Sequence, residues 1–307
     1  MRSNKLMDVK SRQQTIQQFV YPQLIILGWA DILTGFAISG AWWGEPIQLI
    51  APLVFLLVVA GFVSGLGAIL ALLLSIKGED TEQWLTEVIR SKYKYSIAFG
   101  IVLLSLTTLT SLWISYEAAI LTTSIAITAF VHGWLTTKYP FYGLLGLAFY
   151  HASSILLGIS IIPTAIQQRW YLVLIPVIYL AIAVLYEQKA DKLSWFGELT
   201  IILLILVVFE SLFLIYSLPG YDIFKALLFI IILARQILSP YFKSLYDPQP
   251  ETIAIASNAF WVGVFLLDAT LAAGFASWYY ALLVLSTLPI ARTARLASKF
   301  DETNTYI

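Results

Sequence analysis

The chain has 307 residues, of which 60% are hydrophobic and 12% are charged, and its formal net charge at pH 7 is zero. The balanced charge gives no indication of nucleic acid or of an acidic partner, and the lack of cysteine excludes disulfides, thiolate metal sites and cysteine nucleophiles. Runs of about 20 apolar residues recur from end to end and predict an all-α polytopic membrane protein.

The N-terminal arm, residues 1–19, is polar and basic and has no short apolar core, so we expect no cleaved signal peptide. Ten apolar spans are predicted after it, at 20–40, 48–76, 95–114, 117–136, 142–164, 170–187, 197–217, 222–240, 252–273 and 278–296. Because only Gly274 to Ser277 joins the last two, nine spans and one re-entrant or interfacial helix remain an alternative. We expect a single transmembrane domain over 1–307, with a cytoplasmic tail at 297–307.

Lysine and arginine predict the orientation, because cytoplasmic loops carry an excess of both. With the N-terminus inside, all 18 of these residues except Arg169 and Lys225 fall on the cytoplasmic side, and both termini are cytoplasmic. We expect the plasma membrane of a prokaryote or an equivalent internal membrane. The two large charged inside segments are 77–94 and 187–196, so any chemistry is expected to face the cytoplasm.

Several ionisable residues lie within the apolar spans, where a charge costs about 2.5–3.5 kcal/mol or more. By depth we place Asp31 at mid-membrane, His151 in the inner half, and Arg235 near an inner helix end. These side chains could line an inward-opening cavity. Alternatively, they could form hydrogen bonds between helices, each worth about 0.6 kcal/mol. Glu210 and Asp268 fall in outer halves, where structural packing or protonation in place is expected.

Two acids follow the sixth span. Glu187 and Asp191 are four residues apart and share a face if the helix continues one turn past the bilayer. Two carboxylates so placed can hold Mg²⁺, which prefers carboxylate oxygens and substrate phosphates. The alternative is a solvated loop in which acids and lysines alternate.

Three regions together resemble the UbiA superfamily of intramembrane prenyltransferases, in particular its EboC-like branch. They are the first-helix segment Trp29 to Ala37, the segment from Thr137 to Ser160, and the C-terminal Phe265 to Phe275 followed by Leu288 to Arg292. In that branch an arginine is usual where His151 stands. The resemblance implies a bundle of nine to ten helices around a central cavity.

The resemblance also implies two acidic motifs, after helices two and six, that hold Mg²⁺ on the diphosphate of a prenyl donor. Glu187 and Asp191 stand where the second motif belongs, with Glu in place of the usual first Asp. The first motif, Asn-x-x-x-Asp-x-x-x-Asp, is degenerate: if Asp80 is its last acid, the other positions are Leu72 and Ile76. Acids nearby could substitute in a shifted register, with Glu79 and Asp80 as the metal candidates.

The implied function is transfer of a prenyl group from a prenyl diphosphate to a hydrophobic or aromatic acceptor, within membrane lipid. Lys138 and Asp31 are the candidate catalytic residues, and the candidates for substrate or diphosphate binding are Arg90, Lys92, Lys94, His151 and Arg235. The alternative is a non-catalytic UbiA-fold protein that binds or transports a hydrophobic metabolite, which loss of the first motif favours. An unrelated secondary transporter is a third, weaker hypothesis.

Overall fold

The structure, a computed structural model, describes residues 24–43, 46–76, 98–136, 140–189 and 195–293, and these residues form helices and no strand. The first helix is Leu24–Ser39. The others, in chain order, are α2 (Pro46–Ile76), Ala98–Ser111, α4 (Tyr116–Thr136), α5 (Pro140–Ile159), α6 (Pro163–Arg169), α7 (Leu174–Lys189), α8 (Trp195–Leu214), α9 (Ile223–Tyr246), α10 (Pro250–Phe275), α11 (Trp278–Leu285) and a last stretch at 287–293.

Six helical segments are long and apolar enough to cross a membrane, and one of them, Pro163–Tyr186, combines α6, a 3-10 turn and α7. Three shorter apolar helices, Leu24–Ser39, Ala98–Ser111 and Leu145–Ile159, coincide with further predicted spans. The tenth predicted span is divided into α11 and the stretch at 287–293. The predicted all-helical membrane architecture is therefore confirmed.

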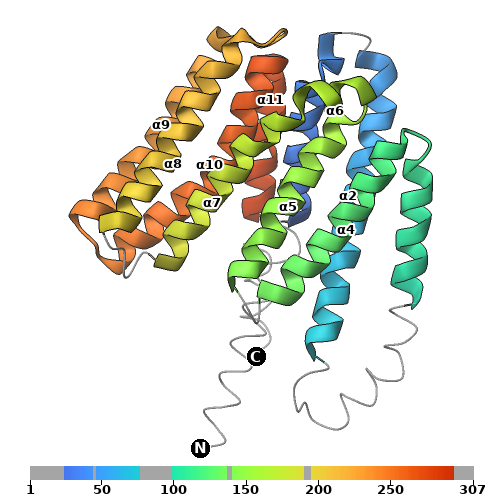
Figure 1. The fold of residues 1–307 in the computed structure, drawn as a ribbon, viewed down its shortest axis with the longest axis horizontal. Helices are drawn as coiled ribbons and strands as arrows, with labels where there is room; N and C mark the ends of the chain where they lie inside the picture. Colours follow the sequence, from blue (N-terminus) through green and yellow to red (C-terminus); the bar gives the residue numbers. More distant parts are fainter. Residues whose placement is uncertain (1–23, 44–45, 77–97, 137–139, 190–194, 294–307) are drawn as a thin grey trace, which may run out of the picture.

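The helices form two neighbouring groups (Figure 1). In one, α10 packs against α9, α7 and α11, and in the other, α4 packs against α2 and α5. Contacts between α5 and α7 join the groups. Within the described chain α10 is deeply enclosed, because every residue from Val262 to Phe275 is buried.

The helix ends that flank the two predicted cytoplasmic segments lie at one end of the bundle, the lower end in Figure 1. Ile76 and Ala98 flank the first segment, and Lys189 and Trp195 flank the second. This placement follows from helices that cross the membrane in alternating directions. Residues 77–97 and 190–194 themselves lie outside the described part of the chain.

The first helix crosses α5 at a glycine pair. A β-carbon on Gly35 would stand 2.0 Å from the carbonyl oxygen of Ile155, and one on Gly158 would stand 2.1 Å from that of Ile32. Only glycine allows two helix backbones to approach so closely. The crossing fixes which faces of these two helices oppose each other.

Candidate functional site

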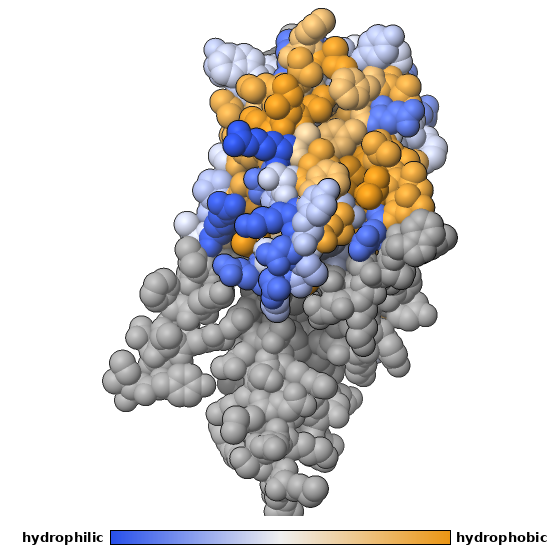
Figure 2. All heavy atoms as spheres, turned by 90° about the vertical axis from the view of Figure 1, so that its left-hand side faces the viewer, coloured by the Kyte–Doolittle hydropathy of each residue, from blue (hydrophilic) through white to orange (hydrophobic). Residues whose placement is uncertain are grey.

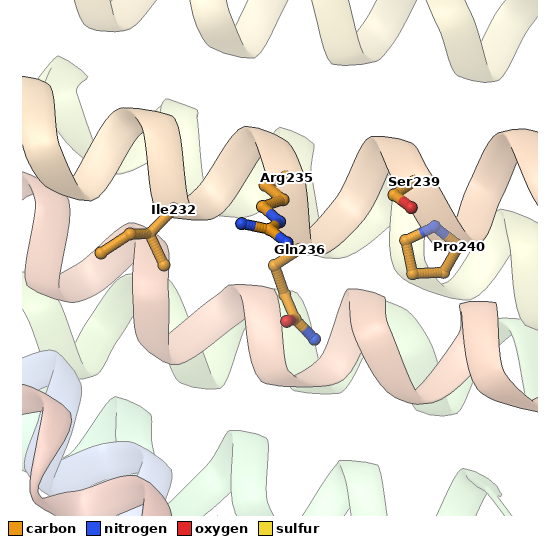
Figure 3. A pocket seen from close by; sticks show the side chains of 5 residues that line it. All are labelled: Ile232, Arg235, Gln236, Ser239 and Pro240. Carbon is orange, nitrogen blue, oxygen red and sulfur yellow. The ribbon is translucent and has the colours of Figure 1, made fainter.

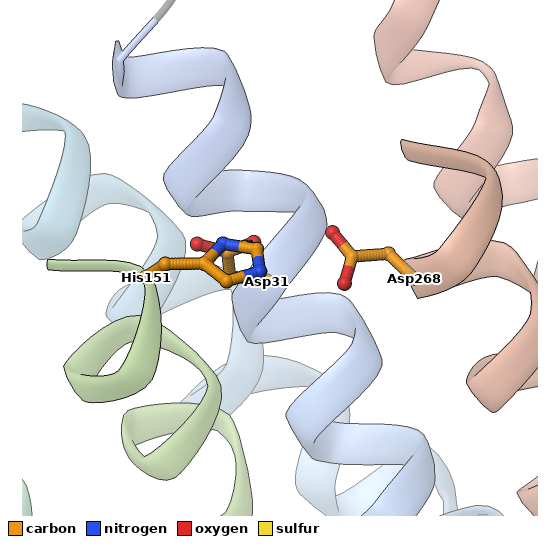
Figure 4. A group of neighbouring side chains, drawn as sticks. All are labelled: Asp31, His151 and Asp268. Carbon is orange, nitrogen blue, oxygen red and sulfur yellow. Dashed lines mark ion pairs between the residues drawn. The ribbon is translucent and has the colours of Figure 1, made fainter. Parts of the chain in front are cut away.

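Three helices that are distant in sequence each contribute one ionisable side chain to the same place. Asp31 comes from the first helix, His151 from α5 and Asp268 from α10, and Figure 4 shows the three side chains pointing toward one another. Asp31 lies one turn before Gly35, and His151 lies two turns before Gly158, so both lie on the faces that the glycine crossing brings together. We call these three residues the buried trio.

The buried trio lies near the middle of the membrane. Asp31 is eight residues from the end of its helix at Ser39, and Asp268 is seven residues from the end of α10 at Phe275. His151 is likewise eight residues from the end of α5. At a rise of 1.5 Å per residue these spacings are about 10–12 Å, between a third and two fifths of the way into a hydrocarbon core of about 30 Å.

The buried trio is compact and closed to solvent. Nδ1 of His151 lies 2.7 Å from Oδ1 of Asp31, and one ligand atom from each residue lies within 4.8 Å of the others. All three residues are 0% exposed. The hydroxyl of Thr34, one turn after Asp31, donates a hydrogen bond of 3.3 Å to the backbone carbonyl of Asp268, which ties the first helix to α10.

The polar atoms of the buried trio are incompletely paired. The carboxyl oxygens of Asp31 and Asp268 and the ring nitrogens of His151 make no well-aligned hydrogen bond with any described residue outside the trio, and within it Asp31 contacts both His151 and Asp268. Buried polar groups are normally paired, because an unpaired one costs about 1–3 kcal/mol and a buried charge costs more. These residues therefore have the capacity to bind something further, and their donor atoms are types that can hold a metal ion.

A second polar cluster lies at the end of α6, the helix at the upper end of the bundle in Figure 1. Arg169, at the end of α6, donates to the carbonyl of Ile38 at the end of the first helix and, at 3.1 Å, to that of Pro219 after α8. Its guanidinium also lies 5.4 Å from the ring centroid of Phe275. We call this set of contacts the Arg169 clasp.

Two glycine turns lie beside the Arg169 clasp. Gly40 and Gly220 adopt positive φ angles of 82° and 84°, which favour glycine, and a β-carbon at either would reach ordinary contact with the guanidinium of Arg169. A hollow of about 460 Å³ beside the clasp is lined by Gly40, Arg169, Pro219, Gly220, Tyr221, Asp222 and Lys225.

Asp222 begins α9 beside this hollow. Its carboxylate accepts a hydrogen bond of 3.0 Å from the backbone N–H of Phe224 and pairs with Lys225 at 3.2 Å. Partial burial raises the pKa of Asp222, but the hydrogen bond and charge of Lys225, with the N–H of Phe224, outweigh it and hold the pKa below its usual value.

A second hollow, of about 340 Å³, lies on α9 and is lined by Ile232, Arg235, Gln236, Ser239 and Pro240 (Figure 3). The side chain of Arg235 is exposed, and no residue of the buried trio lines this hollow. Viewed from the side of α8 and α9, the described surface carries hydrophilic side chains among hydrophobic ones (Figure 2).

The structure brings together two of the predicted site residues, Asp31 and His151, and places Arg235 apart from them. Glu187 falls in the last turn of α7, although its side chain lies outside the described part. The remaining predicted site residues also lie outside it: Glu79, Asp80, Arg90, Lys92, Lys94, Lys138 and Asp191.

Asp268 is the partner that the sequence analysis did not assign to the same site. It was assigned to an outer half and His151 to an inner half, because the fifth span was predicted to continue to residue 164. The structure ends α5 at Ile159, and Pro163 begins α6. Pro163 was the available signal, since proline favours the first turn of a new helix.

Comparison with known proteins identifies the fold. The sequence matches no family model, and no curated protein matches it. Among solved structures the chain is similar to a digeranylgeranylglyceryl phosphate synthase in membranes, with 15% sequence identity and a TM-score of 0.61. The match covers 86% of this chain and 99% of that chain. The chain is therefore an integral membrane protein with the fold of the UbiA-type membrane prenyltransferases.

Proposed function

We propose that the protein transfers a prenyl group from a prenyl diphosphate to a hydrophobic or aromatic acceptor at the cytoplasmic face of the membrane. The observation that carries the proposal is the fold, which a synthase of a prenylated lipid shares over 86% of this chain. The helix ends that flank 77–97 and 190–194 lie at the same end of the bundle, which supports the proposal, since most of the candidate metal-binding and diphosphate-binding residues belong to these segments.

Mg²⁺ is the metal that this proposal requires, and the available donors fit it. Glu187 and Asp191, with Glu79 and Asp80, offer carboxylate oxygens, which Mg²⁺ prefers. α7 is helical through Lys189, which puts Glu187 at its very end. When bound there, Mg²⁺ would supply positive charge to the diphosphate leaving group.

The chain's own basic residues would complete the diphosphate site. Arg90, Lys92, Lys94 and Lys138 can donate charge-assisted hydrogen bonds to phosphate oxygens, and they would hold the developing negative charge as the carbon–oxygen bond breaks. Asp31 was the other candidate catalytic residue. Asp31 and His151 are completely buried, so neither is assigned a part in diphosphate binding.

The second candidate function is non-catalytic binding or transport of a hydrophobic metabolite. One described feature favours it: Leu72 and Ile76 belong to the last two turns of α2, where the first acidic motif would need Asn and Asp. Apolar side chains at these positions cannot bind a metal. Loss of one of two acidic clusters should reduce the rate of ionisation by orders of magnitude.

The test is diphosphate release by the full-length protein in lipid nanodiscs. With geranylgeranyl diphosphate, Mg²⁺ and acceptors of two classes, a glyceryl phosphate and a hydroxylated aromatic acid, we expect Mg²⁺-dependent diphosphate release and a prenylated product. The Glu187→Ala/Asp191→Ala variant should be slower by about 10²–10³-fold. Glu210→Gln, which changes an exposed acid on α8, is the matched control and should retain the wild-type rate.

Binding measurements separate the two functions. Equal, metal-independent binding of the prenyl diphosphate to wild type and the double variant, without diphosphate release, would exclude the transferase. The same result would support the non-catalytic alternative.

A further inference from the structure

We propose that Asp31, His151 and Asp268 bind one divalent transition-metal ion of the Zn²⁺ class in the middle of the membrane. This site is separate from the Mg²⁺ site of the proposed function, which belongs to the lower end of the bundle. The inference does not depend on prenyl transfer.

Charge is the first reason for the inference. Two ionised carboxylates with a neutral imidazole carry two negative charges, and all three residues are 0% exposed. Among the described residues, the one ion-pair contact of either carboxyl group is the 2.7 Å contact between Asp31 and His151. The penalty for a buried ion is several kcal/mol unless it is compensated. A single divalent cation balances this charge.

The unpaired atoms are the second reason. Nε2 of His151 is fully buried and lacks an aligned hydrogen-bond partner in the described chain, and the fully buried carboxyl group of Asp268 has no hydrogen-bond partner there other than Asp31. Figure 4 shows the side chain of Asp268 directed toward the other two. Buried polar atoms that converge on one point without partners are the arrangement expected of ligands for a central ion.

The donor atoms select the class of ion. Mg²⁺ and Ca²⁺ prefer coordination by oxygen alone, whereas an imidazole suits Zn²⁺ and the other late first-row metals. One histidine and two carboxylates from three helices give three protein ligands, which is the number found in open Zn²⁺ sites. The composition of the buried trio therefore favours Zn²⁺ over Mg²⁺.

The spacing is compatible with one ion after a small adjustment. Zn²⁺ lies about 2.0–2.2 Å from nitrogen and oxygen ligands, so two ligands of a tetrahedral ion are roughly 3.3–3.5 Å apart. The ligand atoms of the buried trio lie within 4.8 Å of one another, and the closest pair is 2.7 Å apart. To reach this spacing, the closest pair would move apart by about 0.7 Å and the most distant pair would approach by up to about 1.4 Å.

The enclosure predicts slow exchange of the ion. Since the three side chains have no exposed surface, an ion would enter as the helices assemble and leave when they separate. A chelator should therefore leave the metal in the folded protein and remove it after denaturation. Mg²⁺ bound at the cytoplasmic end of the bundle would exchange freely, so a chelator would remove it from the folded protein and thereby distinguish the two metals.

The test is the metal content of the full-length protein. The protein is expressed with Zn²⁺ in the medium, purified in detergent with a chelator, and analysed by elemental mass spectrometry. We expect about one Zn²⁺-class ion per chain in the wild type and a loss of at least about tenfold in His151→Gln and Asp268→Asn. His132→Gln and Glu210→Gln are the matched controls, because the first changes a histidine and the second a carboxyl group outside the buried trio, and both should retain the metal.

Two results would overturn the proposal: a folded wild-type protein without such a metal, or a folded trio variant that binds as much as wild type. The first would mean that protons neutralise the carboxylates. If a trio variant does not fold, Co²⁺-loaded wild type decides the matter through the presence or absence of hyperfine coupling to an imidazole nitrogen. Glu187→Ala/Asp191→Ala should lose diphosphate release and retain this metal, so the two proposals fail independently.

Discussion

The buried trio and the Arg169 clasp both join segments that are distant in sequence, but they satisfy their polar groups differently. In the clasp, Arg169 donates to two backbone carbonyls that terminate neighbouring segments. In the trio, two carboxyls and an imidazole converge without aligned partners among the described residues. The comparison indicates that the clasp is complete as a structural connection, whereas the trio requires protons or an ion to complete it.

The largest expected effect comes from breaking the trio. His151→Leu leaves two buried carboxyl groups without the imidazole, so we expect the free energy of unfolding to fall by about 3–5 kcal/mol. Thermal unfolding in detergent measures the change. The variant Asp31→Asn/His151→Leu/Asp268→Asn, which removes every charge, should recover part of the loss. Equal destabilisation by the single and triple variants would show that charge does not couple the three residues.

The next effect tests the helix crossing that positions the trio. Gly35→Ala places a methyl group 2.0 Å from a backbone oxygen of α5, which must force the helices apart, and we expect a loss of about 1–3 kcal/mol or more. Gly65→Ala is the matched control, since its methyl group would meet its nearest neighbour at 3.7 Å. There the better helix propensity of alanine should leave stability unchanged or raise it by about 0.5–1 kcal/mol. Equal effects at the two positions would contradict the close crossing.

A smaller effect is expected at the clasp. Arg169→Met removes both hydrogen bonds and retains a flexible apolar side chain near Phe275, so the free energy of unfolding should fall by about 1–2 kcal/mol. Thermal unfolding again provides the measurement. The metal content should not change, which separates the clasp from the trio. A loss as large as that of His151→Leu would show that the clasp too is more than a structural connection.

The smallest effect is a pH dependence beside the clasp. Because the pKa of Asp222 in the folded protein lies below the ordinary value of 3.8, its ionised form stabilises the fold above that pH. This contribution is lost as the pH falls below 3.8 and through the lowered pKa. Asp222→Asn should therefore flatten the decline in melting temperature between about pH 4 and pH 2. Lys225→Met should do the same, because Lys225 is the carboxylate's main partner. If both variants lose melting temperature below pH 4 as steeply as the wild type, the pH dependence does not come from Asp222.

The sequence predicted the helices well because apolar runs and turn residues are local signals. Glycines of α2 and α5 allow these helices to pack closely, because a β-carbon at Gly67 or Gly146 would stand 2.9 Å from a backbone atom of α4. The sequence did not predict the trio, because the depth of each residue in the membrane was inferred from the predicted ends of its span, and those ends were inexact. An error of five residues at the end of α5 is about 7.5 Å along the helix axis, enough to assign His151 and Asp268 to different depths.

The order in which the trio's helices occur in the chain has a consequence for biogenesis. The ribosome delivers Asp31 in the first helix, whereas Asp268 follows only with α10, when most of the protein is already in the bilayer. Until α5 brings His151 to it, Asp31 must be tolerated by the translocon as an isolated acid, at a cost of about 2.5–3.5 kcal/mol, and the pair then waits for Asp268. Assembly of the buried trio is therefore a late event in synthesis. A nascent chain truncated before α10 would keep an incomplete trio, which cellular quality control could recognise.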